Sequence, residues 1–206
     1  MLNELHRVFG TMEFEDNGML RVTGFECQGA EATLRFDLHT GVEQEPPQPW
    51  RVDCHGLEGF AFSSSLAYNL DVTDDDPALW PHTQPSAKLY CSVVTPDKAD
   101  ALLGALYRAH VEAVGEADEA IPFGRGLNAV NAFDGGLGLV AEGPLSLLRA
   151  YQRSLEVHGV RTSVIGEQPP HRWDGQQWIR MPAGLQLLVF GDNWIVAESF
   201  EIARAV

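Results

Sequence analysis

The chain contains 206 residues, of which 45% are hydrophobic and 21% charged, the composition of a globular protein with one large domain or two small ones. This composition excludes a disordered, collagen-like or coiled-coil chain, and no run of about 18 apolar residues predicts a membrane-spanning helix. The 14 basic and 29 acidic residues give a net charge of −15, which repels nucleic acid and anionic membrane surfaces. The charge instead favours a basic protein or a cationic ligand as the partner.

Residues 1–73 have the alternating pattern of an antiparallel β region. Asp16-Asn17-Gly18 predicts a hairpin turn between strands at 12–15 and 19–25, because Asn-Gly tolerates the backbone angles of such a turn. Three further segments alternate apolar and polar residues, as strands do when one face is buried and the other is in water. The residues predicted to face inwards are Ala32, Leu34, Phe36 and Leu38, then Trp50, Val52 and Cys54, and then Leu66, Tyr68, Leu70 and Val72.

Residues 74–87 separate this region from the rest of the chain. They contain Asp74-Asp75-Asp76 and then Pro77, Pro81 and Pro85. Because proline lacks a backbone donor and restricts the chain, three prolines this close together predict a linker or a surface loop without regular structure.

Residues 88–206 predict an α+β region. A helix over 96–114 begins at Thr95-Pro96-Asp97, ends at Gly115, and carries an apolar stripe centred on Leu106. With a second helix and three short strands, this order is typical of a split βαβ, ferredoxin-like unit. The strands are expected at 89–94, 137–141 and 160–165, and the second helix, between Gly143-Pro144 and Gly159, should pack through Leu148, Tyr151 and Leu155.

The last part of the chain predicts two β-hairpins. Asp174-Gly175 lies between Trp173 and Trp178, and Gly191-Asp192-Asn193 separates apolar runs at 185–190 and 194–202. These strands could complete either sheet, so residues 1–206 could also form one continuous domain. The predicted fold class is therefore α+β, with an N-terminal antiparallel sheet, a βαβ-type unit and C-terminal hairpins.

Motifs that identify a cofactor or a catalytic mechanism are absent. There is no phosphate-binding loop, zinc-protease helix, Cys-x-x-Cys or nucleophile elbow, and we therefore expect no cofactor. The three cysteines, Cys27, Cys54 and Cys91, are too few and too widely spaced for a disulfide framework, and we expect all three to be buried thiols. Residues 1–10 lack the apolar core of a signal peptide. These features predict a cytoplasmic protein.

The most specific pattern is an Arg-x-Asp-x-His motif that occurs twice. Its residues fall on the polar face of two predicted neighbouring strands, where directly opposed side chains lie about 5 Å apart. We expect Arg–Asp pairs in water, or a ligand-binding face, and no metal. The alternative is a metal or hydrolytic site with His39, His55, Asp37 and Asp53, in which Asp53 and His55 would be the catalytic participants. This polar ladder comprises Arg35, Asp37, His39, Arg51, Asp53 and His55.

Two isolated residues are weaker candidates. Glu198 lies among Trp194, Val196, Phe200 and Ile202 in the last predicted strand; a carboxylate on an apolar face there would be costly to ionise and a candidate catalytic acid. The other reading is that this face is exposed and that Ile195 and Ala197 point inwards. Arg125, between two glycines, is a candidate for gripping a ligand from a loop.

Two classes of function remain open. The first is a non-enzymatic protein-binding module, an inhibitor or immunity-type partner of a basic protein, which the acidity, small size and missing motifs favour. The second is a metal-dependent or hydrolytic enzyme that uses the polar ladder. The residues do not indicate an oligomeric state.

Overall fold

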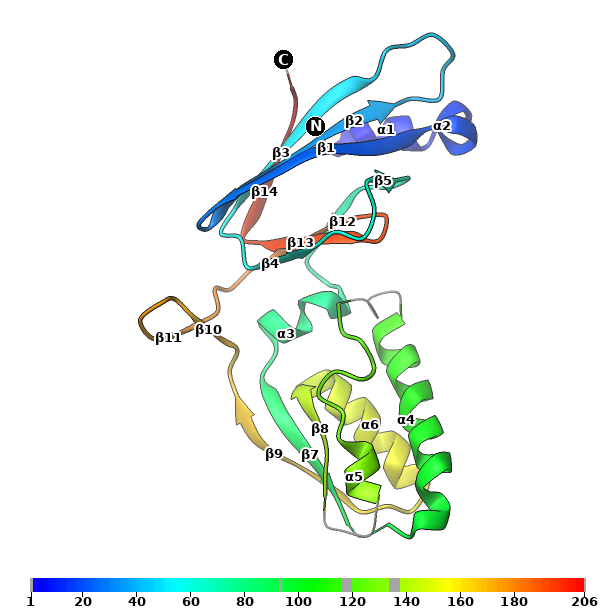
Figure 1. The fold of residues 1–206 in the computed structure, drawn as a ribbon, viewed down its shortest axis with the longest axis vertical. Helices are drawn as coiled ribbons and strands as arrows, with labels where there is room; N and C mark the ends of the chain where they lie inside the picture. Colours follow the sequence, from blue (N-terminus) through cyan, green and yellow to red (C-terminus); the bar gives the residue numbers. More distant parts are fainter. Residues whose placement is uncertain (1, 93, 116–119, 134–137, 206) are drawn as a thin grey trace. The chain divides into compact units, whose positions relative to one another are not determined.

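The structure is a computed structural model that describes residues 2–92, 94–115, 120–133 and 138–205. The chain divides into two compact units: unit 1 comprises Met1–Asp74 and Pro182–Val206, and unit 2 comprises Asp75–Met181 (Figure 1). Both units combine helices with antiparallel sheet, so the α+β class is confirmed. The chain from Pro182 onwards belongs to unit 1, whereas the segment 171–180, the first of the predicted C-terminal hairpins, belongs to unit 2.

Unit 1 consists of two antiparallel sheets preceded by two short helices, α1 (Leu2–Phe9) and α2 (Met12–Asn17). The five-stranded sheet has the order β14-β3-β2-β1-β5, and the four-stranded sheet has the order β4-β13-β12-β6. The strands are β1 (Met19–Gln28), β2 (Glu31–His39), β3 (Gln48–His55), β4 (Gly59–Ala61), β5 (Leu66–Ala67), β6 (Asp71–Thr73), β12 (Gln186–Phe190), β13 (Asn193–Ala197) and β14 (Ser199–Arg204).

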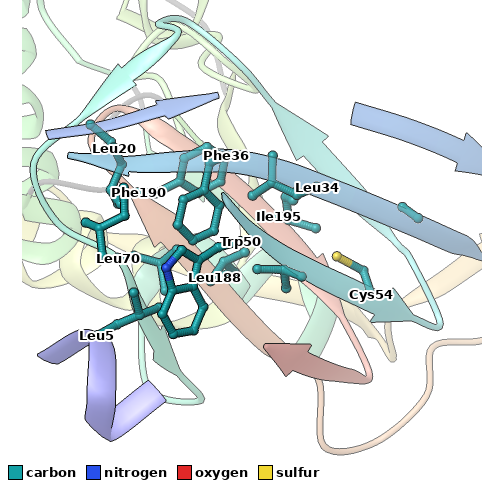
Figure 2. Packing of buried hydrophobic residues seen from close by; sticks show 14 of the residues in the cluster. Leu5, Leu20, Leu34, Phe36, Trp50, Cys54, Leu70, Leu188, Phe190 and Ile195 are labelled. Carbon is teal, nitrogen blue, oxygen red and sulfur yellow. The ribbon is translucent and has the colours of Figure 1, made fainter. Parts of the chain in front are cut away.

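The core of unit 1 lies between the inner faces of these two sheets. Figure 2 shows Phe36, Trp50 and Leu34 from the five-stranded sheet packed in one cluster with Leu188 and Ile195 from the other. The inward faces predicted for β2 and β3 are confirmed, because every one of their seven apolar residues is buried. The predicted alternation over 66–72 is wrong: Tyr68 is 66% exposed while its neighbour Ala67 is buried. The pattern breaks there because the chain leaves β5 before it begins β6.

The strand predicted at 12–15 is also wrong, because these residues form α2. The hydroxyl of Thr11 accepts a hydrogen bond from the Phe14 amide at 3.3 Å and caps the helix. Phe14 is buried and packs against Gly18, where an added Cβ would lie 2.1 Å from the Phe14 ring. Gly18 is therefore required for close packing against the helix, and not for a hairpin turn.

Unit 2 contains a three-stranded antiparallel sheet of order β8-β7-β9. Because β8 and β9 both pair antiparallel with the central strand, they run parallel to each other, and α6 connects them across β7 as in a split βαβ unit. The wider comparison with the ferredoxin-like fold stays a prediction. The elements are α3 (Trp80–Thr83), β7 (Ser86–Cys91), α4 (Ala99–Val114), α5 (Ala129–Phe133), β8 (Gly138–Pro144), α6 (Leu145–Val157), β9 (Thr162–Gln168), β10 (His171–Trp173) and β11 (Trp178–Arg180).

Two segments of unit 2 test the predictions about proline and helix periodicity. The expected irregular loop contains two helical turns, Pro77–Leu79 and α3, because Asp76 accepts a hydrogen bond from the Ala78 amide at 2.7 Å and proline is tolerated at the start of a turn. The apolar stripe of α4 is confirmed, with Leu106 fully buried and Gly115 ending the helix at a φ of 59°. The strand predicted at 137–141 begins at Gly138 in the structure, and residue 137 lies outside the described residues.

The predicted C-terminal hairpins are present as β10–β11 and β12–β13, and β14 follows after a break at Glu198.

Of the cysteines, Cys54 and Cys91 are buried, but Cys27 is exposed near the end of β1, which corrects the expectation for that thiol. Among the described residues, no helix combines the length and the apolar character needed to cross a membrane.

Candidate functional site

The polar ladder lies on the outer face of the five-stranded sheet, and β2 and β3 pair antiparallel as expected. The register places Arg35 opposite Arg51, Thr33 opposite Asp53 and Glu31 opposite His55. His39 is therefore at the far end of β2 from His55, about 27 Å away at a strand rise of about 3.4 Å per residue. The four residues of the alternative metal site do not converge.

Arg35, Arg51 and Asp53 of the ladder each have a neighbour of opposite charge. The guanidinium of Arg35 donates to Glu26 on β1 at 2.7 and 3.3 Å, and these hydrogen bonds lower the pKa of Glu26. Nε of Arg51 lies 2.9 Å from Asp53, whose other carboxylate oxygen accepts a hydrogen bond from the Thr33 hydroxyl at 3.0 Å. Both oxygens of the Asp53 carboxylate, which a catalytic or metal-binding role would require, are therefore already in contact with other side chains.

His55 forms the closest contact in the ladder. Its Nδ1 lies 2.5 Å from Glu31 on β2, and this hydrogen bond raises the pKa of His55, with smaller contributions from the negative charges of Glu201 and Asp53. The imidazole is partly exposed to water and contacts the Glu31 carboxylate, while the charges of Glu201 and Asp53 act on it from further away. This arrangement favours the protonated form of His55, which is a poor metal ligand and a poor general base.

Glu198 is exposed at the break between β13 and β14, which agrees with the reading in which Ile195 and Ala197 point inwards. Its amide donates to the His55 carbonyl at 2.9 Å, and its side chain lies over Gly56, where an added Cβ would come within 2.5 Å of it. Gly56 has a φ of 67°. Glu198 therefore lies in the connection between β13 and β14, beside the end of β3, and not on the apolar face of a strand.

Arg125 lies in a loop that pairs with β8 in unit 2. The Gly126 carbonyl accepts a hydrogen bond from the Glu142 amide at 2.9 Å, which brings Arg125 to a pocket of about 180 Å³ that Gln84, Glu142 and Leu147 also line. Ligand pockets are more commonly about 300–1,000 Å³. The role of Arg125 in gripping a ligand stays a prediction.

The surface that the sequence interpretation missed is a cluster of three phenylalanines on unit 1, here called the aromatic patch: Phe25, Phe60 and Phe62. The ring of Phe25 on β1 lies 4.8 Å from those of both Phe60 on β4 and Phe62, and the last two rings are 5.7 Å apart. Phe60 is 46% exposed and Phe62 is 36% exposed. An exposed cluster of large apolar side chains is typical of a site that binds another molecule.

Among the residues that the structure describes, the aromatic patch lies where both sheets of unit 1 have an unpaired strand edge. Strand β4 is the outermost strand of the four-stranded sheet. Strand β5 pairs with β1 at Leu20 and Arg21, so within the described part of the chain the stretch 23–28 of β1 has no strand on that side. Such edges offer backbone donors and acceptors to an added strand.

A buried asparagine positions the chain that follows β4. The Asn193 side-chain oxygen accepts hydrogen bonds from the Ser63 and Ser64 amides at 2.8 and 3.0 Å, while its amide nitrogen donates to the Phe190 carbonyl at 3.0 Å. Asn193 is fully buried, so its bond to Phe190 is shielded from water, whereas its bonds from Ser63 and Ser64 are partly buried. The turn predicted at 191–193 contains this residue, but its role in holding the Phe62 segment depends on contacts distant in sequence.

Metal binding has no support in the described geometry. Across 2–92, 94–115, 120–133 and 138–205, no three His, Cys, Asp or Glu side chains are grouped so that they could hold a metal ion. No family model, curated protein or solved structure matches the chain.

Proposed function

We propose that this chain is a non-enzymatic protein-binding module, an inhibitor or immunity-type partner of a basic protein, and that unit 1 receives the partner at the aromatic patch. The observation that carries the proposal is the exposure of Phe60 and Phe62 beside an unpaired strand edge. Aromatic side chains that stay in water in the free protein gain most from burial when a partner covers them.

The free strand edges define the form of the partner. A strand of the partner that pairs with β4 would add its backbone hydrogen bonds to the four-stranded sheet, as in β-strand addition. Alternate side chains of that strand would then cover the rings of Phe60 and Phe62. Recognition of this kind requires an extended apolar segment and no catalytic group.

The charge of unit 1 defines the sign of the partner. Unit 1 contains 16 acidic and 5 basic residues, a net charge of −11, whereas unit 2 has 13 acidic and 9 basic residues and a net charge of −4. One acidic residue, Asp192, lies next to the segment that follows Phe62, because its backbone carbonyl accepts a hydrogen bond from the Ser63 hydroxyl. A basic segment is therefore attracted to this unit, and more strongly at low salt.

The test is an affinity measurement with a short peptide of alternating lysine and valine. We expect the whole chain to bind it, to bind it less tightly as salt is added, and to ignore a glutamate–valine peptide of equal length. Replacing Phe60 and Phe62 together by serine should reduce the affinity at least tenfold, or about 1.4 kcal/mol. Calorimetric titration measures all of these quantities.

Tyr68→Ser is the matched control, because this aromatic side chain is more exposed than either phenylalanine and lies outside the three-ring cluster. It should leave the affinity unchanged. Equal affinity of the double serine variant and the unaltered chain, with both folded by circular dichroism, would refute the proposal, as would equal binding of the two peptides.

A further inference from the structure

Unit 2 carries a second exposed aromatic surface, which differs from the patch on unit 1 in that it includes basic side chains. In the hairpin β10–β11, Trp173 is directly opposite Trp178, and His171 is opposite Arg180. Since alternate residues of a strand share a face, these four side chains lie on the same side of the hairpin. This face, called the Trp face below, consists of His171, Trp173, Trp178 and Arg180.

All four side chains of the Trp face are exposed. Trp173 is 54% exposed and Trp178 is 69% exposed, although their rings contact each other edge to face at 5.8 Å. Trp and Arg are the residues most enriched among those that dominate the affinity of protein interfaces. Two tryptophans left in water on one small hairpin therefore point to a partner that covers them.

The hairpin is already ordered for binding. The Asp174 carboxylate accepts hydrogen bonds from the Gln176 and Gln177 amides at 2.8 Å each, and these bonds lower the pKa of Asp174. At the base of the hairpin the Met181 amide donates to the Pro170 carbonyl at 3.0 Å. A turn that is fixed in this way loses little conformational freedom when a ligand binds.

We propose that the Trp face binds an acidic peptide segment that also carries apolar side chains. The face itself contains no carboxylate, and within the described part of the chain no acidic side chain lies at ion-pair distance from Arg180. The Arg180 guanidinium is thus available for a carboxylate of the ligand, and the indoles for its apolar side chains.

The geometry of the indoles favours a peptide over a sugar or a nucleic acid. The two ring planes meet at 63°, so the pair presents a ring face beside a ring edge and not a flat platform for stacked rings. The apolar side chains of a peptide can pack on such an angled pair without a flat ring of their own.

The test is a titration of the whole chain with a short peptide of alternating glutamate and leucine, followed by the shifts of the indole N–H signals in NMR spectra. We expect the Trp173 and Trp178 signals to move and the buried Trp50 signal to stay in place. Trp178→Ser and Arg180→Gln should each weaken binding at least fivefold. Arg161→Gln, an exposed arginine outside the hairpin, is the control and should have no effect.

Each alternative ligand has its own arm in this experiment. A lysine–leucine peptide, a cello-oligosaccharide and an oligouridylate are titrated under the same conditions, and the proposal requires that none of them bind the Trp face as tightly as the glutamate–leucine peptide. Tighter binding of any of the three, or an Arg180→Gln variant that binds the acidic peptide with unchanged affinity, would overturn the assignment.

Discussion

The polar ladder and the aromatic patch are two surfaces of the same unit, and they differ in whether their side chains already have partners. Arg35, Arg51 and His55 each contact a carboxylate of the chain itself. Phe60 and Phe62 contact other rings but remain substantially in water. Residue types associated with catalysis are here satisfied by their neighbours, whereas the functional candidate consists of ordinary apolar residues that lack a cover.

The largest expected effect separates the two faces of one strand. Leu34 is fully buried between the sheets, so Leu34→Ala should reduce the free energy of unfolding by about 2–5 kcal/mol. The next residue, Arg35, lies on the polar ladder, and Arg35→Ala should change stability far less, because an exposed ion pair contributes little. Urea unfolding followed by fluorescence compares the two variants. Equal losses would show that the ladder is part of the core.

The next effect concerns the support of the aromatic patch. Asn193→Ala leaves the partly buried Ser63 and Ser64 amides without their acceptor and removes the buried bond to the Phe190 carbonyl, and a buried unsatisfied group costs about 1–3 kcal/mol. The same change should release the segment after β4 and weaken binding of the lysine–valine peptide. Asn69→Ala, which removes one exposed bond to the Gly191 amide, is the control and should have the smaller effect on both quantities.

A smaller effect is expected where the ladder was a candidate metal site. His39 lies at the end of β2 opposite Met19 and far from His55, so His39→Ala should change stability by no more than about 0.5 kcal/mol. Adding Zn²⁺ or a chelator should leave the thermal midpoint of unfolding unchanged, both in the unaltered chain and in His39→Ala. A rise in the midpoint with Zn²⁺ that both His39→Ala and His55→Ala abolish would restore the enzyme hypothesis.

The smallest effect is a pH dependence of the His55–Glu31 pair. Because the folded-state pKa of His55 is raised, the pair stabilises the fold fully below the pKa of an unfolded histidine, about 6.5, and this stabilisation disappears as pH rises through the folded-state value. NMR titration of the imidazole should show that Glu31→Gln lowers its pKa. Glu26→Gln, a carboxylate paired with Arg35 instead, should leave it unmoved.

The parts of the fold that were predictable are those in which the signal is local. The inward faces of β2 and β3 and the buried stripe of α4 follow from periodicity, because one side of each element meets a continuous core. The helix α2 and the helical turns after Asp76 are short, and their capping bonds outweigh the hairpin and proline signals of the same residues. Periodicity says little about segments this short.

The site was predictable in composition but not in arrangement. Two Arg-x-Asp-x-His motifs indicate a polar sheet face, yet an antiparallel register puts Arg35 opposite Arg51 and separates the two histidines. Phe60 and Phe62 alternate with Ala61 as in an ordinary half-buried strand. Their exposure follows from the edge position of β4, which depends on pairing with β13 more than a hundred residues later.

Amide hydrogen exchange with and without the lysine–valine peptide tests the central claim most directly. If the partner adds a strand at the aromatic patch, exchange should slow at 59–62 on β4, and the amides of β14, at the opposite edge of the five-stranded sheet beside the ladder, should be unaffected. Protection confined to β14, or spread evenly over the acidic surface, would contradict the account.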